Sequence, residues 1–285
     1  MYKSILLCTD GSPSADVATD YAVGLAKKLG ARVLALSVTD IRVLEGPLLA
    51  DISGALGAQP YSALLPQLEQ IQRDKAEAIL KAVSRRCADQ GVAHEVAHET
   101  GSLVQTMLDY ERRADLVVLG QRGEHARWSE GMLGSSVERM VRASVKPCLV
   151  TSDRFRPIKH ILLAHDGSAE SSKALCGGID LAADLGVEVT IVTVCQRDNE
   201  EAASKILQQA HRQAIEKKLT ARAQLEHGNA ETEILKLSEK IGADLIVMGA
   251  YGHTRIRELI LGSTTSHVLR KATVPVLLTR GQGRG

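Results

Sequence analysis

The chain alternates short apolar runs with longer segments in which apolar residues recur every three or four positions. Short runs such as Leu116–Leu119 and Leu245–Met248 are apolar at consecutive positions, which is typical of parallel strands covered on both faces. The longer segments, such as 15–29 and 169–185, fit amphipathic helices. The alternation predicts an α/β fold, with helices wound on both sides of a mostly parallel sheet.

The expected elements occur in the same order in each half of the chain. In the first half we expect strands at 4–9, 32–38, 93–99 and 147–151, a fourth strand ending at Gly120, and helices at 15–29 and 103–113. In the second half we expect strands at 158–164, 188–194, 222–227 and 275–279, a fourth strand ending at Gly249, and helices at 169–185 and 231–241. A further helix follows the last glycine of each half. Each half is therefore expected to form a five-stranded, mostly parallel sheet.

The two halves are copies of one another. Residues 5–12 (Ile-Leu-Leu-Cys-Thr-Asp-Gly-Ser) match residues 161–168 (Ile-Leu-Leu-Ala-His-Asp-Gly-Ser) at an offset of 156 residues. Similarity on the scale of a whole domain indicates a tandem duplication, because solenoid repeats are much shorter. The boundary falls in the short polar stretch 152–157, which ends in proline. We therefore expect domains at 1–152 and 158–285.

The first copy carries an insertion. From Gly120 and Gly249 onward the offset falls to 129, so the first copy has 27 additional residues, at about 40–66. The segment is rich in Leu, Ala, Gly and Pro and poor in charge, which disfavours a free linker. Three roles remain open for this insertion: a lid over the first site, a docking surface for a partner, or a loop packed on its own domain.

Composition narrows the classes of function. Hydrophobic residues make up 44% and aromatic residues 2% of the chain, so the cores are expected to be aliphatic. A net charge of +1 and few aromatic rings argue against nucleic-acid binding. The sequence has no run of 18 apolar residues that could span a membrane. Its five cysteines form no CxxC motif. We expect a cytoplasmic protein with no membrane partner, in which Cys8 and Cys148 are small buried residues.

A glycine-rich segment follows the fourth strand of each copy. In the second copy the spacing is G-x2-G-x9-G-S, and in the first copy ten residues replace the nine. The residues concerned are Gly120, Gly123, Gly134, Ser135 and Ser136, and in the second copy Gly249, Gly252, Gly262, Ser263 and Thr264. A glycine loop that leaves a strand and enters a helix can hold phosphate on backbone N–H groups. The repetition indicates a nucleotide ligand.

Four other residues are expected at the same edge of the sheet. Asp10 and Asp166 follow the first strands, and Val38 and Val194 end the second strands. Folds of this class bind ligands beyond the carboxyl ends of the strands, where the strand order reverses. An aspartate carboxylate there can accept hydrogen bonds from a sugar or a base, whereas valine can offer only its backbone groups.

With these motifs the chain resembles the universal stress protein family in its tandem two-domain form, over essentially residues 1–280. The resemblance implies that the glycine motif holds the ribose and phosphates of ATP or another adenine nucleotide, and that the Asp and Val hold base and sugar. Whether Mg accompanies the nucleotide is left open. The implied residues are Asp166, Val194, Gly249, Gly252, Gly262, Ser263 and Thr264, and in the first domain Asp10, Val38, Gly120, Gly123, Gly134, Ser135 and Ser136. The resemblance also implies that the last strands of the two domains pair internally, and it is compatible with a dimer of tandem chains.

Each of these residues also has a plainer explanation. Gly249 and Gly252 could end a strand at positive φ, Ser263 and Thr264 could be ordinary N-caps, and Asp166 could cap the next helix. The sites also differ, since the first loop is formally neutral between its outer glycines whereas the second carries one net positive charge. We expect the second site to be the better occupied.

A zinc protease motif occurs by coincidence. Residues 94–98 read His-Glu-Val-Ala-His, but that motif requires a helix to bring both imidazoles onto one metal ion. The segment has the pattern of a short strand, in which the two histidines would stand ~13 Å apart. We therefore expect no metal site.

No catalytic motif accompanies the expected nucleotide site. The chain contains neither GxxxxGK(S/T) nor GxSxG. Tight binding alone does not accelerate hydrolysis. We expect a nucleotide-binding regulator of the stress response without efficient turnover. The alternatives are an interaction module that binds no nucleotide and a slow ATPase or self-phosphorylating protein with Ser263 or Thr264 as acceptor.

Overall fold

The computed structural model describes residues 2–41, 58–123, 133–250 and 261–279, although not the side chains of 58–64. Each half contributes five strands. Those of the first half are β1 (Ser4–Cys8), β2 (Arg32–Asp40), β3 (His94–Gly101), β4 (Leu116–Gly120) and β5 (Cys148–Thr151). Those of the second half are β6 (His160–Ala164), β7 (Glu188–Cys195), β8 (Ala221–His227), β9 (Leu245–Gly249) and β10 (Val276–Thr279).

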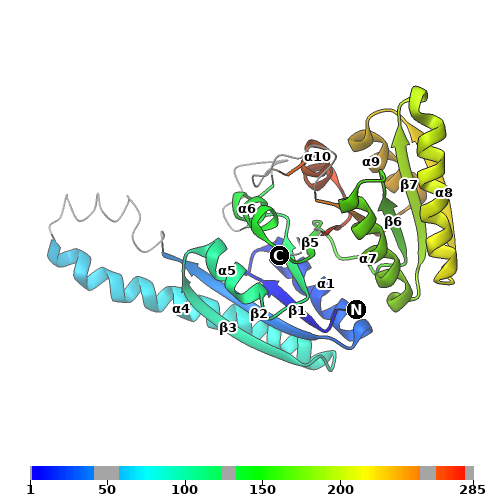
Figure 1. Cartoon of the computed structure of the whole chain (residues 1–285). Helices are drawn as coiled ribbons and strands as arrows, with labels where there is room; N and C mark the ends of the chain where they lie inside the picture. Colours follow the sequence, from blue (N-terminus) through cyan, green and yellow to red (C-terminus); the bar gives the residue numbers. More distant parts are fainter. Residues whose placement is uncertain (1, 42–57, 124–132, 251–260, 280–285) are drawn as a thin grey trace.

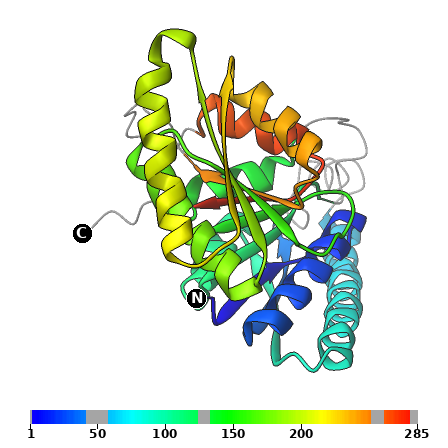
Figure 2. The same cartoon turned by 90° about the vertical axis from the view of Figure 1, so that its right-hand side faces the viewer.

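All ten strands form one sheet in the order β3-β2-β1-β4-β5-β10-β9-β6-β7-β8 (Figure 1). Neighbouring strands within each half are parallel. The halves join where β5 and β10 pair antiparallel, with Val276 opposite Val150 and Leu278 opposite Cys148. The turned view shows the strands of the second half crossing in front of those of the first, as the twist of a long sheet requires (Figure 2). The predicted parallel sheets and the predicted pairing of the last strands are both confirmed.

Helices cover both faces of the sheet. The helices are α1 (Pro13–Leu29), α4 (Ala58–Asp89), α5 (Leu103–Glu111), α6 (Ser135–Ala143), α7 (Ala169–Leu185), α8 (Glu200–Glu216), α9 (Ala230–Ile241) and α10 (Ser263–Lys271), and a short 3-10 turn, η2 (Arg197–Asn199), precedes α8. Residues of α1, α4, α7 and α8 pack into one aliphatic core, and residues of α5, α6, α9 and α10 into the other. Each core contains side chains from both halves, so the two domains share their hydrophobic layers.

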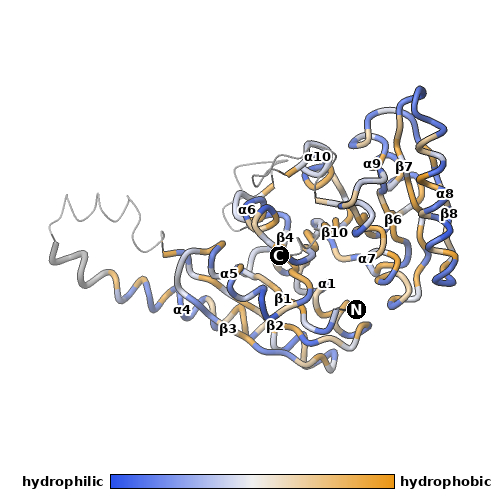
Figure 3. Tube along the Cα trace, in the orientation of Figure 1, coloured by the Kyte–Doolittle hydropathy of each residue, from blue (hydrophilic) through white to orange (hydrophobic). Residues whose placement is uncertain are grey.

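The central strands are hydrophobic on both faces, as their apolar runs predict. β1, β4, β6 and β9 are buried at every position. The hydrophobic colouring in Figure 3 is concentrated in the interior, as around β6. Cys8 and Cys148 are buried, as expected, and neither forms a disulfide with another described residue. None of the described helices is both long and apolar enough to cross a membrane.

Local signals explain where the helices after the first strands begin and end. Ser12 and Ser168 are the N-caps of α1 and α7, and each hydroxyl accepts a hydrogen bond from a backbone N–H of the first turn. Gly30 and Gly186 end these helices in the left-handed conformation, at φ 61° and 66°. The predicted ranges of both helices therefore agree with the structure to within two residues.

The polar stretch between the copies is held against the first half. The Tyr21 hydroxyl donates to the Arg154 carbonyl (3.4 Å) and accepts from the Arg156 N–H (3.1 Å). The ring of Phe155 lies edge-on to that of Tyr21, with centroids 4.9 Å apart. The connection between the copies is thus packed against α1.

The region around the insertion differs from expectation in part. The pattern analysis assigned no helix between the second and third strands, whereas α4 and α8 occupy those positions. Residues 58–66 of the insertion belong to α4, which has 32 residues against 17 in α8. Residues 42–57 lie outside the described part of the chain, so the role of the insertion stays open.

The histidines of the zinc-like motif lie in a strand, as predicted. His94 and His98 belong to β3. The His98 Nε2 contacts the Thr39 Oγ1 at 2.9 Å, whereas the His94 Nδ1 contacts the Val92 carbonyl oxygen at 3.1 Å. The two imidazoles therefore have separate partners.

Candidate ligand-binding pocket

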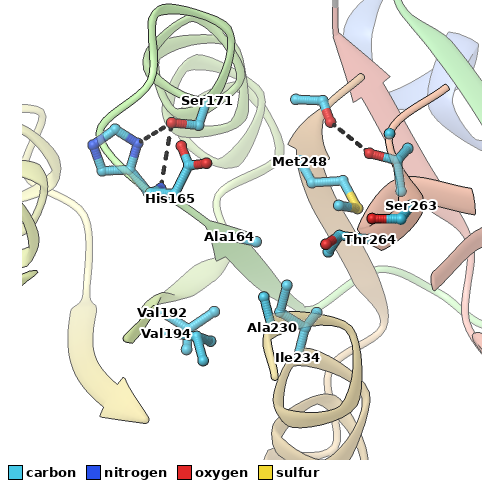
Figure 4. Close-up of a pocket in the computed structure, with 14 residues that line it drawn as sticks. Ala164, His165, Ser171, Val192, Val194, Ala230, Ile234, Met248, Ser263 and Thr264 are labelled. Carbon is cyan, nitrogen blue, oxygen red and sulfur yellow. Dashed lines mark hydrogen bonds between the residues drawn. The ribbon is translucent and has the colours of Figure 1, made fainter. Parts of the chain in front are cut away.

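A pocket opens at the carboxyl ends of the second-half strands (Figure 4). It encloses about 160 Å³ between the ends of β6, β7 and β9 and the first turns of α7, α9 and α10. Six of the seven residues predicted for the second site line it: Asp166, Val194, Gly249, Gly262, Ser263 and Thr264. The seventh, Gly252, lies outside the described residues. The structure thus brings together side chains that are up to 98 positions apart in the sequence.

Asp166 belongs to a tight turn between β6 and α7. Its Oδ1 accepts a hydrogen bond from the Ser168 N–H (2.9 Å), and Gly167 between them has a φ of +82°, which favours glycine. Ser168 is the N-cap, because its Oγ accepts from the Ser171 N–H (3.1 Å). The simple explanation of Asp166 as the cap of the next helix is therefore wrong. Its carboxylate is exposed at the edge of the pocket.

His165 is a pocket residue that the sequence analysis missed. It is buried, and its Nδ1 lies 3.0 Å from the Ser171 Oγ. That hydroxyl accepts from the Asp166 N–H (3.3 Å) and donates to the Ser168 carbonyl (3.1 Å). Burial lowers the pKa of His165, against the opposing effects of its hydrogen bond with Ser171 and of the Asp166 charge, which favours the neutral imidazole. The sequence held one signal for this residue, namely that the two copies differ here: the first copy has Thr9 at the position of His165.

The N-terminus of α10 forms the polar wall. Gly262 is the N-cap, with a φ of −56°, and has no side chain that could accept from the first N–H groups of the helix. Ser263 and Thr264 occupy the first two helical positions, so the interpretation of these two residues as N-caps is wrong. The positive end of the helix dipole and the N–H groups of its first turn, for which the helix itself has no acceptor, therefore face the pocket, an arrangement that favours an anion.

The first glycine of the motif is required by packing. A Cβ on Gly249 would lie 3.0 Å from the backbone carbon of Glu170 and 3.1 Å from the Ser171 nitrogen. At Gly120 of the first half it would lie 2.8 Å from the backbone of Ser14. Gly249 is not among the positive-φ glycines, so the positive-φ explanation is wrong for it, whereas Gly252 lies outside the described residues. Glycine allows each strand end to approach the next helix closely.

Opposite α10 the pocket wall is apolar. Val194 is half-buried and pairs with Glu226 of β8. The remaining apolar lining residues are Ala164, Val192, Ala230, Ile234 and Met248, none of which the sequence analysis identified. The enclosed volume is comparable to a cavity of roughly 150 Å³ that admits a benzene-sized ring. The pocket therefore combines space for a flat apolar group with an anion-binding wall.

The first half repeats this arrangement of backbone. The Asp10 Oδ1 accepts from the Ser12 N–H (2.9 Å) across Gly11, which has a φ of +74°. Gly123 lies against this turn, since a Cβ there would stand 3.1 Å from the Asp10 Oδ2. Gly134 is the N-cap of α6. The remaining predicted residues occupy equivalent places: Val38 in β2, Gly120 at the end of β4, and Ser135 and Ser136 at the start of α6.

Three wall positions carry bulkier side chains in the first half. Cys8 pairs with Leu36, where Ala164 pairs with Val192 in the second half. Leu103 is the first residue of α5, as Ala230 is of α9. At these three positions the first half carries the larger side chain, whereas Leu119 stands where Met248 does and Val38 where Val194 does.

Comparison with known proteins matches the whole chain to one family. The profile of the universal stress protein family matches residues 1–152 and 157–280. A universal stress protein of Synechocystis sp. is 38% identical over 293 residues, covering 98% of this chain and 100% of the relative. One from Mycolicibacterium smegmatis is 24% identical, covering 97% and 96%. Among solved structures, a universal stress protein from Archaeoglobus fulgidus has the same fold, with a TM-score of 0.76, 23% identity, and coverage of 97% and 98%.

Proposed function

Because the chain belongs to the universal stress protein family, in tandem form, we propose that its second half binds an adenine nucleotide, ATP or a close relative of it. We further propose that the nucleotide-bound protein acts as a regulator in the stress response. The observation that carries the proposal is the pocket itself. One cavity joins an apolar wall to a helix N-terminus that has no side-chain cap.

Each part of the pocket matches one part of a nucleotide. The N–H groups at Ser263 and Thr264 would hold phosphate oxygens, supported by the helix dipole. Asp166 stands at the edge of the pocket, where its carboxylate would accept hydrogen bonds from ribose hydroxyls. The wall of Val194 and Ile234 would cover the base. The residues present therefore fit the ligand that the motif implies, with Gly252 completing the set.

Binding without efficient turnover is the proposed mode of action. Acceleration of hydrolysis requires groups that stabilise the transition state more strongly than the bound nucleotide. In this proposal His165, whose Nδ1 is engaged with Ser171, lines the pocket without acting as a general base. The pocket residues therefore bind and orient the nucleotide, and the protein would respond to its presence.

We propose a weaker, second nucleotide site in the first half. Its residues would be Asp10, Val38, Gly120, Gly123, Gly134, Ser135 and Ser136. In this proposal each site belongs to one domain, and the domains span residues 1–152 and 158–285. Where a triphosphate is bound, Mg accompanies its phosphates. The weaker affinity is supported by Leu36 and Leu103 at the wall positions.

The first test is to denature the purified protein and to identify and count the released nucleotide by chromatography and mass spectrometry. We expect an adenine nucleotide close to one per chain, rising toward two if the first half also retains ligand. No release, and no uptake from millimolar ATP with magnesium, would contradict the proposal and favour a nucleotide-free interaction module. Labelled γ-phosphate on Ser263 or Thr264, or turnover above that in buffer, would favour the enzymatic alternative.

A further inference from the structure

Gln121 connects the glycine loop of the first half to a helix of the second. It directly follows Gly120, and only 6% of it is exposed. Its side-chain Nε2 donates a hydrogen bond to the Leu269 carbonyl of α10 at 2.6 Å. Its own carbonyl accepts from the N–H of Gly134, the N-cap of α6, at 3.1 Å. One residue is thus bonded to the phosphate-facing helices of both halves.

The bond to Leu269 anchors the far end of α10. Leu269 lies in the last turn of this helix, directly after Val268, whose carbonyl accepts the hydrogen bond from the Ala272 N–H at the C-cap. A buried carbonyl without a partner is costly, so the Gln121 amide fixes where this turn sits. The helix has only nine residues, and its N-cap Gly262 stands about 10 Å from Leu269 along the axis. A displacement of the last turn would therefore reach the N–H groups that face the pocket.

The second half has no equivalent of this side chain. Ala250 follows Gly249 as Gln121 follows Gly120, and its methyl group cannot donate a hydrogen bond. The backbone of Ala250 instead donates to the Thr279 carbonyl at 3.1 Å. The anchor supplied by a glutamine side chain therefore runs from the first glycine loop to the second site.

We infer that Gln121 is a positioning residue for the second pocket. It holds α10 so that the first N–H groups of the helix point at the phosphates of the ligand. The first glycine loop therefore sets the affinity of the second half for phosphate, in addition to any role in binding a ligand in the first half. This inference rests on the proposed function, because it concerns the same pocket.

The test compares a phosphorylated ligand with one that has no phosphate. Gln121→Met keeps the length of the side chain and removes the donor, and Gln105→Met on the exposed face of α5 is the matched control. Calorimetric titration measures the affinity for ADP and for adenosine. We expect Gln121→Met to weaken ADP binding about five- to tenfold, the effect of one hydrogen bond, and to change adenosine binding less than twofold. The control variant should bind both ligands as the wild type does.

Other outcomes would overturn the inference. Equal losses for ADP and adenosine would indicate a general disturbance of the fold, and unchanged ADP affinity would show that the bond does not position α10. Gln121→Leu, which also lacks the donor, replaces Gln121→Met if that variant does not fold. Failure of the wild type to bind either ligand would overturn the proposed function and this inference with it. Binding by the wild type with no selective loss in the variants would overturn the inference alone.

Discussion

The two halves share one scaffold but differ at the residues around their ligand-binding edges. Both have the Asp-Gly-Ser turn, with Asp10 and Asp166 making the same hydrogen bond to the following serine. Both begin their last helix at a glycine N-cap. The walls differ, because Leu103 stands in the first half where Ala230 stands in the second. Duplication has preserved the residues that form the turn and the helix start, whereas those that decide pocket size have diverged.

The polar surroundings of the two aspartates differ as well. In the second half His165 and Ser171 contact one another and hold the backbone of Asp166. The first copy has Thr9 and Ala15 at these positions, and there the Thr9 hydroxyl accepts from the Gly11 N–H at 3.4 Å. The turn therefore does not require the His–Ser pair, and the pair is particular to the second site.

The largest expected effect comes from a carboxylate at the phosphate position. Gly262→Asp would place a negative charge at the N-terminus of α10, and like charges brought together cost several kcal/mol. We expect nucleotide affinity to fall at least ~100-fold, as measured by titration calorimetry. The fold should be retained, because aspartate is a favoured N-cap and the φ of −56° suits any residue.

The matched change in the first half tests whether the sites differ. Gly134→Asp introduces the same charge at the N-cap of α6, where a Cβ meets only ordinary contacts of 3.5 Å or more. We expect this variant to retain most of the bound nucleotide. A loss equal to that of Gly262→Asp would contradict the assignment of the better site to the second half.

Exchanging wall residues between the halves should have an intermediate effect. Ala230→Leu gives the second pocket the side chain of the first, and overpacking of this kind costs about 1–3 kcal/mol. We expect adenosine and ATP to lose affinity by a similar factor, about tenfold, in titration calorimetry. Leu103→Ala should increase binding in the first half. Unchanged adenosine affinity in Ala230→Leu would exclude α9 from the base-binding wall.

The smallest expected effect is a pH dependence of the free energy of unfolding that originates at His165 in the second half. Burial lowers the pKa of His165 below its ordinary value near 6.5, so the unfolded chain binds a proton that the folded chain does not. The free energy of unfolding should therefore fall as the pH drops below about 6.5, and it should be unaffected by this group above neutral pH. Thermal unfolding of wild type and His165→Thr, which carries the first-half residue, measures the difference.

The expected result is a steeper loss of stability at acidic pH for the wild type than for His165→Thr. His94→Thr, at an exposed position of β3, serves as the control and should follow the wild type. Identical pH profiles for wild type and His165→Thr would show that protonation of this histidine is not linked to folding.

The sequence predicted the strands better than the helices, for physical reasons. Continuous apolar runs such as that of β9 have no exposed face to obscure the pattern. α8 buries Ala203, Leu207, Ala210 and Ala214 at intervals of three and four residues, a helical pattern that the sequence analysis overlooked.

The site was predictable only where backbone geometry demands a particular residue. The glycine motif and Asp166 were identified because close approach and tight turns restrict residue type. Ala230, Ile234 and Met248 were not identified, because aliphatic residues at these positions look like any core residue. Only the topology of the sheet places them around one cavity.

Because one chain carries both β5 and β10, the stability of their antiparallel contact does not depend on protein concentration. Their association is unimolecular and does not weaken on dilution, whereas two separate subunits would dissociate below their dissociation constant. A dimer of identical chains is also bound by its symmetry, so any substitution changes both sites at once. Covalent linkage removes that constraint. One half is free to narrow its cavity while the other keeps it open, and two unequal sites can persist within a single polypeptide.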